Sequence, residues 1–314
     1  MLNSETGVLM SKRSKIAVLG AGFIGFNLID RLIIDGHEVN VLDRKSCPSN
    51  LIGKVNWFQA DISDNFDLLE ILENVDIVFH LFSNTVPGDE VDIQSEIFYN
   101  VGILINILDT CIKSGIRKLF FLSSASVYGQ RVHLPLTEND YTFPISMHGV
   151  HKITMENILG VYNVKFNMDC KVIRLSNPYG IGQRLNGRQG IVSILIGNYL
   201  RNEVTTIMGD GSSIRDYIHI NDVINALKIL MNSNTSYSIF NLGSGTGVSI
   251  NHIISLISKS VGADLKIRYI PSRIDDIDNN ILDISRITDE VGFMAKVDLE
   301  FGVKEYTKYC LDVD

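Results

Sequence analysis

The 314-residue sequence has few cysteines and no basic run, and each scarcity excludes a class of protein. The cysteines are scattered without metal-ligand spacing, so we expect reduced thiols, as in a cytoplasmic protein: Cys47, Cys111, Cys170 and Cys310. A formal net charge of −8 and a pI near 5.4 argue against a nucleic-acid-binding surface. No histidine or carboxylate residues have the spacing of metal ligands, so no metal is predicted.

Long apolar runs without charges are also lacking. Residues 1–14 are predicted to be a disordered leader, because their one apolar piece, residues 7–10, is too short for the core of a signal peptide. No later run approaches the length of a membrane span without charged residues. A hydrophobic content of 45% and a charged content of 20% are typical of globular proteins. We therefore expect a cytoplasmic globular protein without membrane contact.

A glycine-rich turn is the most informative feature that is present. It follows the apolar run 15–19 and opens a helix-like stretch over residues 24–35. The first glycine permits a tight turn, the second lets backbone approach a pyrophosphate, and the third lets the helix pack close to the strand. The next β-like run ends in Asp43, whose carboxylate suits the ribose of NAD and repels the 2′-phosphate of NADP. We predict an NAD site formed by Asp43 together with Gly20, Gly22, Phe23, Ile24 and Gly25.

β-like runs alternate with helical patterns in the first 175 residues. The runs are 15–19, 38–42, 55–59, 77–81, 118–123 and 170–174. Such alternation predicts an α/β fold with a doubly wound parallel (Rossmann) sheet. Beyond Asn177 the alternation loosens and clusters of glycine and aspartate become more frequent. We therefore expect an NAD-binding domain over residues 15–177 and a smaller, C-terminal substrate-binding domain over residues 178–314, some segments of which return to pack on the first.

The helical pattern over residues 95–114 is apolar around most of its circumference, as Ile97, Phe98, Ile103 and Leu104 illustrate. A helix of this kind has a second apolar face to bury. That face either packs against a neighbouring helix of the same chain or forms the interface of a symmetric dimer. The pattern fits both arrangements.

Polar residues suited to proton transfer follow the expected strands, at the edge where open parallel sheets bind ligands. Ser124 comes directly after the run 118–123, and a later helix begins near His148 and Lys152. Because His148 and Lys152 are four residues apart, they share one face of that helix. Spacing alone, however, favours polar surface residues over a reaction centre. Tyr128, in the loop after Ser124, is predicted to be structural.

Several motifs in this order resemble those of the extended short-chain dehydrogenases/reductases, within the NAD-dependent epimerase/dehydratase family. The pattern is most similar to UDP-glucose/UDP-galactose 4-epimerases and covers nearly the whole chain after the leader. Besides the glycine turn, the motifs are His80-Leu81, the Ser-Val-Tyr-Gly run at 126–129, Asn177-Pro178-Tyr179-Gly180, Gly209-Asp210-Gly211 and the run 215–219.

The resemblance implies further ligand contacts and an assembly. Around NAD, the implied contacts are Asp61 and Ile62 at the adenine, Leu81, Asn100 and Lys152. Around the diphosphate of a nucleotide sugar, they are Asn177, Arg215, Arg273 and Asp276. The resemblance also implies a homodimer through the helices at 95–114 and 148–162.

One residue departs from the family's active-site pattern, Tyr-x-x-x-Lys, because His148 precedes Lys152 where the family has tyrosine. In the family, the tyrosine moves the proton of the sugar hydroxyl, the lysine lowers the tyrosine pKa and binds the nicotinamide ribose, and a serine, here Ser124, bonds the reacting oxygen. Free imidazole has a pKa of ~6.5, so a histidine is mostly neutral at pH 7 and can act as the base. We predict Ser124, His148 and Lys152 as catalytic residues.

The resemblance predicts an NAD-dependent C4 epimerase of a UDP-hexose, working through a 4-keto intermediate. One alternative is an NAD(P)H-dependent reductase of a 4-keto-6-deoxy nucleotide sugar, in which one-way proton donation tolerates histidine better. The other alternative is a family member that binds NAD and a nucleotide sugar without turnover. The change at His148 is the only feature that favours the last of these.

Overall fold

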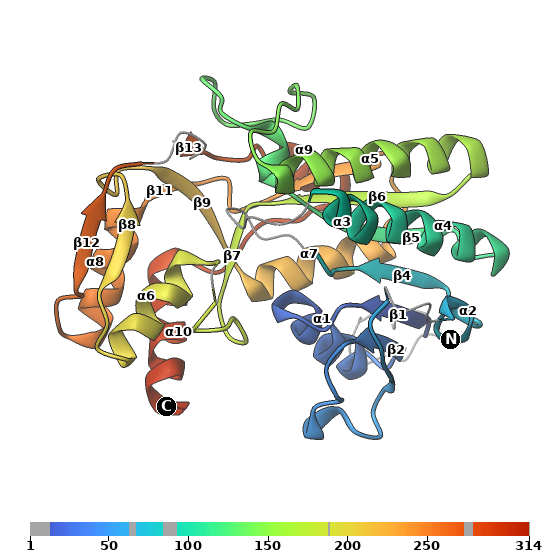
Figure 1. Ribbon diagram of the computed structural model, residues 1–314, viewed down its shortest axis with the longest axis horizontal. Coiled ribbons are helices and arrows are strands. Elements are labelled where there is room, and N and C mark those ends of the chain that lie inside the picture. Colours follow the sequence, from blue (N-terminus) through green and yellow to red (C-terminus); the bar gives the residue numbers. More distant parts are fainter. Residues whose placement is uncertain (1–12, 63–66, 84–92, 188, 273–278, 314) are drawn as a thin grey trace, which may run out of the picture.

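A computed structural model describes residues 13–62, 67–83, 93–187, 189–272 and 279–313. A seven-stranded sheet, ordered β10-β6-β5-β4-β1-β2-β3, forms the centre of its larger part (Figure 1). All its neighbouring strands are parallel, and their bounds are β1 Lys15–Leu19, β2 Glu38–Asp43, β3 Asn56–Gln59, β4 Ile77–His80, β5 Lys118–Ser124, β6 Asp169–Leu175 and β10 Ile239–Leu242. The doubly wound parallel sheet is thus confirmed, and the predicted runs agree with β1–β6 to within one residue at each end.

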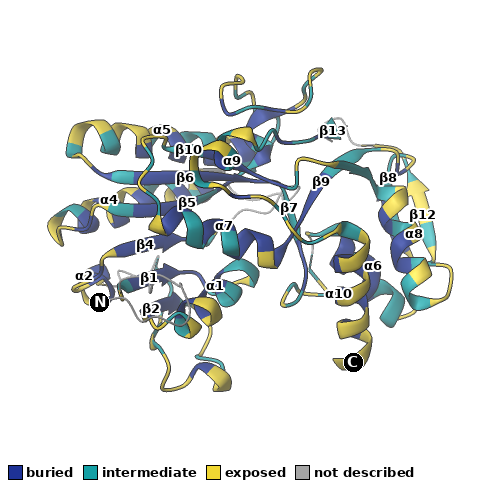
Figure 2. Ribbon diagram, turned by 180° about the vertical axis from the view of Figure 1, so that it is seen from behind, coloured by how far each residue is buried: buried dark blue, intermediate teal, exposed yellow. Residues whose placement is uncertain are grey.

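Helices cover both faces of this sheet, and alternate residues of its strands point to opposite faces. In β1, Ile16 and Val18 pack with α1 (Phe23–Ile34), α7 (Ile220–Asn232) and α9 (Ser285–Val291). Ala17 and Leu19 pack on the opposite face with α2 (Leu68–Leu72), α4 (Ile103–Lys113) and α5 (Met147–Phe166). Figure 2 shows the result as dark strands between helices whose outer surfaces are exposed.

The predicted helix over residues 95–114 consists of three pieces. They are α3 (Ile93–Ile97), a π-helical turn, η2 (Phe98–Gly102), and α4. The stretch Gln94–Lys113 is long and apolar enough to cross a membrane by length and composition alone, although it contains the charged residues Glu96, Asp109 and Lys113. Its Leu104, Ile107 and Leu108 are fully buried against the sheet, so packing in the core accounts for this apolarity.

A smaller part of the structure is built around β9 (Ile214–His219), which pairs with β7 (Asn177–Tyr179), β11 (Gly247–Ser249) and β13 (Asn279–Asn280). A second small sheet pairs β8 (Thr205–Met208) with β12 (Ile267–Ile270). The helices of this smaller part are α6 (Ile191–Leu200), α8 (Ile250–Val261) and α10 (Leu299–Val313). Short 3-10 turns are η1 (Ser49–Leu51) and η3 (Ala125–Tyr128). Between these elements, α7 and β10 cross back to the large sheet, which divides residues 178–314 between the two parts.

Candidate active site

The glycine turn has the geometry that its sequence predicts. Gly20 lies at φ +100°, and its N–H donates to the Leu42 carbonyl at 2.9 Å, which ties the turn to β2. A Cβ on Gly25 would meet the Gly20 carbonyl oxygen at 2.0 Å, so only glycine lets α1 start this close to β1. A Cβ on Gly22 would meet nothing within 4 Å, and Gly22 borders the cleft described below. The N-terminus of α1 therefore has open space before it for a phosphate group.

Asp43 holds this turn from the end of β2. Its Oδ2 accepts the N–H of Ala21 at 2.8 Å, and its Oδ1 accepts the N–H of Lys45 at 2.9 Å. Asp61 lies beside it after β3, with one carboxylate oxygen 3.7 Å from the Arg44 guanidinium. The Asp43 carboxylate is thus fixed at the end of β2, where a ribose diol of NAD would be held. The glycine turn and this carboxylate together fit a dinucleotide.

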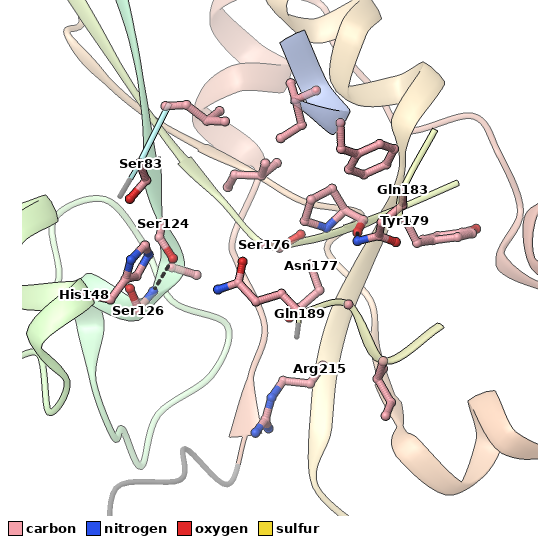
Figure 3. Close-up of a pocket in the computed structure, with 18 of the residues that line it drawn as sticks. Ser83, Ser124, Ser126, His148, Ser176, Asn177, Tyr179, Gln183, Gln189 and Arg215 are labelled. Carbon is pink, nitrogen blue, oxygen red and sulfur yellow. Dashed lines mark hydrogen bonds between the residues drawn. The ribbon is translucent and has the colours of Figure 1, made fainter. Parts of the chain in front are cut away.

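A cleft of about 900 Å³ opens at the carboxyl ends of the strands and continues toward the smaller part of the structure (Figure 3). It brings together most of the predicted site residues: Gly22, Phe23, Ile24, Gly25, Leu81, Ser124, His148, Lys152, Asn177 and Arg215. Gly20, Asp43, Asp61, Ile62 and Asn100 lie outside its lining. Arg273 and Asp276 fall outside the described residues.

Ser124 and His148 face this cleft from neighbouring elements. The Ser124 hydroxyl caps η3 by accepting the N–H of Ser126 at 3.1 Å. His148 stands in the first turn of α5, where Ser146 is the N-cap residue and accepts the N–H of Gly149. A Cβ on Gly149 would lie 2.8 Å from the Ser126 carbonyl oxygen, so the start of α5 is pressed against the loop after β5. This close packing sets the serine and the imidazole beside one another (Figure 3).

Lys152 enters the cleft from one turn later in α5 and is largely buried. Its ammonium donates to the Leu122 carbonyl at 2.7 Å and lies 4.6 Å from the centroid of the Phe121 ring. Burial lowers the pKa of Lys152 to about 8, although the nearby Glu156 carboxylate opposes this shift. His80, at the end of β4, is fully buried, and burial with the Lys152 charge lowers its pKa to about 3, so it stays neutral.

The opposite wall comes from the small sheet. Arg215 pairs with Asn280 of β13, and Tyr217 pairs with Asn177 of β7. Residues two apart on a strand point to the same side, so all four face the cleft together. The side-chain amide of Asn177 donates to the Asp216 carbonyl at 2.9 Å, which fixes its orientation. This wall offers a cation and neutral polar groups to an anionic, hydroxyl-rich ligand.

The sequence analysis missed several cleft residues. Five buried polar atoms that border the cleft have no hydrogen-bond partner within the described structure: Ser126 Oγ, Ser176 Oγ, Gln183 Oε1, the Tyr217 hydroxyl and Asn280 Oδ1. Buried polar groups are normally paired, so these atoms fit a ligand with many polar groups. Ser176 and Tyr217 could have been found, because each lies one or two residues from a predicted contact. Nothing in the local sequence distinguishes Asn280.

Two predicted NAD contacts, Asn100 and Ile62, have other surroundings. Asn100 is buried in η2 and donates to the Glu96 carbonyl at 2.8 Å. Ile62 packs against the core on the α2 side of the sheet. Tyr128 donates to Asn241 and accepts from Arg174, which agrees with its predicted structural role. Within the described part of the chain, no group of three or more histidine, cysteine or carboxylate residues is placed to hold a metal ion.

Comparisons with known proteins agree with this geometry. The model of the "NAD dependent epimerase/dehydratase family" matches residues 16–243. UDP-glucose 4-epimerase of Mycolicibacterium smegmatis is 31% identical over 300 residues, with 92% of this chain and 96% of that protein covered. The dTDP-4-dehydro-6-deoxyglucose reductase of Escherichia coli is 29% identical over 301 residues, with 92% and 95% covered.

Among solved structures, UDP-glucose 4-epimerase with UDP-glucose from Thermotoga maritima has a TM-score of 0.88 and 30% identity, over 95% of this chain and 99% of that one. The parallel sheet and the glycine turn are those of an extended short-chain dehydrogenase/reductase. Within that class, the chain belongs to the NAD-dependent epimerase/dehydratase family, and NAD is its cofactor.

Proposed function

We propose that this chain is a nucleotide-sugar 4-epimerase that acts on a UDP-hexose with NAD. The observation that carries the proposal is a single cleft with the glycine turn at one end, Ser124, His148 and Lys152 in the middle, and Asn177 and Arg215 on the far wall. Two of the similar proteins above are named as UDP-glucose 4-epimerases. Arg273 and Asp276 are part of the proposed nucleotide-sugar site by family resemblance alone.

In the proposed mechanism each residue has one task. NAD, when bound, supplies the site that accepts a hydride from C4 of the sugar and returns it to the other face of a 4-keto intermediate. The Ser124 hydroxyl holds the oxygen on C4. His148 takes the proton of the sugar's C4 hydroxyl as the ketone forms. It returns this proton after the 4-keto sugar has rotated in the site. The Lys152 ammonium, which is largely buried at the cleft, would supply positive charge to the ribose of bound NAD.

A histidine can carry this proton without the assistance that tyrosine needs. Tyrosine has an ordinary pKa of ~10, so a phenolate must be stabilised by a nearby cation, whereas free imidazole is mostly neutral at pH 7. An imidazole is shorter than a phenol, so the sugar must sit closer to α5 or receive the proton through a water molecule. Retention of the serine, the lysine and the glycine turn supports a working enzyme over a binding protein without turnover.

One specific observation favours a second candidate, because a protein named as a 4-keto-sugar reductase is 29% identical over nearly the whole chain. In such a reductase, His148 would donate a proton once and NADH would be consumed. To separate the two, the purified protein is incubated with UDP-glucose, UDP-N-acetylglucosamine and a 4-keto-6-deoxy sugar nucleotide, each with and without NADH. We expect interconversion of a UDP-sugar without net use of NADH. Consumption of NADH with the keto sugar alone would establish the reductase instead.

We also propose a homodimer formed by the helices at 95–114 and 148–162. Apolar side chains are exposed on both neighbouring segments, including Phe98 (61%) on η2 and Val161 (56%) on α5. A second copy of the chain would cover this surface.

A cytoplasmic location is part of the same proposal and is supported by four cysteines without a disulfide.

Phe98→Glu is expected to convert the dimer to a monomer, because a carboxylate buried in an apolar interface loses its hydration without a partner. Sedimentation velocity measures the change in mass. The matched control is Phe301→Glu on α10, a phenylalanine of similar exposure (62%) far from these helices, which should leave the mass unchanged. A Phe98→Glu protein of the parent's mass would place the interface elsewhere.

A further inference from the structure

A fully buried ionic cluster lies directly behind the reaction centre. The Glu156 carboxylate accepts hydrogen bonds from the Arg174 guanidinium at both oxygens: Nη2 donates to Oε2 at 2.7 Å, and Nε is shared between Oε2 at 3.0 Å and Oε1 at 3.3 Å. It also accepts a hydrogen bond from the Ser123 hydroxyl. All three residues are at most 5% exposed. An arginine–carboxylate pair with two parallel hydrogen bonds is both strong and geometrically restrictive.

This cluster fixes the spacing of the candidate catalytic residues. Three consecutive residues at the end of β5 take separate roles: the Leu122 carbonyl accepts from Lys152, the Ser123 hydroxyl donates to Glu156, and Ser124 faces the cleft. Lys152 and Glu156 are one turn apart on α5, so the first two contacts clamp that helix to the strand. Arg174 adds β6 to the same clamp.

The cluster also controls the charge around Lys152. The groups that face its ammonium are the Leu122 carbonyl of β5, the neutral His80 of β4 and, along α5, the Glu156 carboxylate. On α3, the Glu96 carboxylate lies 3.6 Å from the His151 ring instead. Burial opposes the charged form of Lys152, and Glu156 is the negative group that favours it.

We propose that Glu156 is a positioning residue that holds α5 against β5 and keeps Lys152 a cation during the reaction. This inference rests on the proposed function, since it concerns the same reaction centre. Loss of the Lys152 proton would then limit activity at alkaline pH. Without the carboxylate, Lys152 would lose its proton at lower pH, because burial would then disfavour the cation with no negative group to oppose it.

The test is Glu156→Gln, which keeps the shape of the side chain and removes its charge. The alkaline limb of the pH–rate profile, expected near pH 8 in the parent from the pKa of Lys152, should move down by roughly one unit. At pH 7 the effect should fall on kcat, with KM for the nucleotide sugar nearly unchanged. The matched control is Glu138→Gln, a buried carboxylate near Arg286 in the same region, which should leave the alkaline limb in place.

A second readout does not depend on turnover. The pKa of Lys152 is lowered in the folded chain, so the unfolded chain binds more protons above about pH 8, and the free energy of unfolding gains a contribution that rises with pH until the ordinary pKa of 10.5. In Glu156→Gln that rise should begin at lower pH. In a Lys152→Met background, Glu156→Gln should no longer alter it.

The proposal would be overturned if the alkaline limb of the pH–rate profile lay at the same pH in the parent and in Glu156→Gln. It would also be overturned if Glu156→Gln still changed the pH dependence of the free energy of unfolding in the Lys152→Met background. Should Glu156→Gln fail to fold, Ser123→Ala removes one contact of the clamp and leaves the charge. It should lower kcat several-fold at every pH without moving the limb, and an unchanged kcat would refute the positioning role. If the parent turned over no UDP-sugar, that result would count against the proposed function alone. The unfolding measurement tests the effect of Glu156 on the charge of Lys152 separately.

Discussion

Replacing Gly22 with alanine is expected to weaken NAD binding at least ~10-fold while leaving the fold intact, since a methyl group forced against a ligand costs about 1–3 kcal/mol. Gly22 has φ −72° and ψ −161°, which alanine also adopts, and its Cβ would meet no protein atom within 4 Å. It borders the cleft at the first turn of α1, so the methyl group would occupy space that a pyrophosphate needs. Calorimetric titration with NAD and thermal unfolding measure the two effects separately.

Gly25→Ala is the matched comparison, because it adds the same methyl group three residues later. There the Cβ would lie 2.0 Å from the Gly20 carbonyl oxygen, so α1 must move away from β1 and the fold itself should lose stability. The midpoint of thermal unfolding should therefore fall well below that of Gly22→Ala. Parent-like NAD binding in Gly22→Ala would show that the pyrophosphate does not approach α1 at this residue.

The large sheet could be predicted because its strands are buried on both faces and are nearly continuous apolar runs. Ile16 and Val18 face one set of helices and Ala17 and Leu19 face the other, so β1 contains no polar residue after Lys15. A buried parallel strand of this kind can be recognised without knowing its neighbours. The glycine turn was predictable for a related reason, since Gly20 has a positive φ and a Cβ on Gly25 would collide with the Gly20 carbonyl oxygen.

Other features depend on contacts that are distant in sequence. β10 joins the sheet because Ile239–Leu242 pair with Val172–Leu175, some 67 residues earlier along the chain, and no local pattern predicts that pairing. The π-helical turn at Phe98–Gly102 interrupts a helix whose apolar pattern predicts continuity. The far wall of the cleft likewise requires the register of β7, β9 and β13, which brings Asn177, Tyr217 and Asn280 together.

The importance of His148 for the mechanism can be recognised only by comparison with the family's active-site pattern. His148 has the spacing of a polar residue at the start of a helix, and spacing alone could not assign it a task. In the structure it lines the same cleft as Ser124 and Lys152, and the Gly149–Ser126 contact presses its helix turn onto the serine loop. An imidazole in that place either carries the proton or leaves the transfer to another group, such as a water molecule held by Ser124.

His148→Phe is therefore expected to lower kcat by at least ~10², the usual effect of removing a well-placed acid/base group. Phenylalanine keeps an aromatic ring at this position but can neither exchange a proton nor form the hydrogen bonds of an imidazole. Binding of NAD and of a UDP-sugar should survive, because the glycine turn, Lys152 and Arg215 are unchanged. Steady-state rates and calorimetric titrations with both ligands measure these two expectations. A His148→Phe protein as active as the parent would show that another group, such as a water molecule held by Ser124, carries the proton.

His148→Tyr completes the test, because it restores the residue that the family pattern has at this position. If histidine is an adapted proton carrier, tyrosine should give activity comparable to or above the parent, with a pH dependence that follows Lys152, since the phenol needs the ammonium to ionise near neutral pH. If the parent is inert with every nucleotide sugar and tyrosine creates activity, the chain binds NAD and sugar nucleotide without turnover. In that case Ser124, Lys152 and the cleft wall are sufficient for catalysis once tyrosine is present, and the single change at residue 148 separates a binding protein from an enzyme.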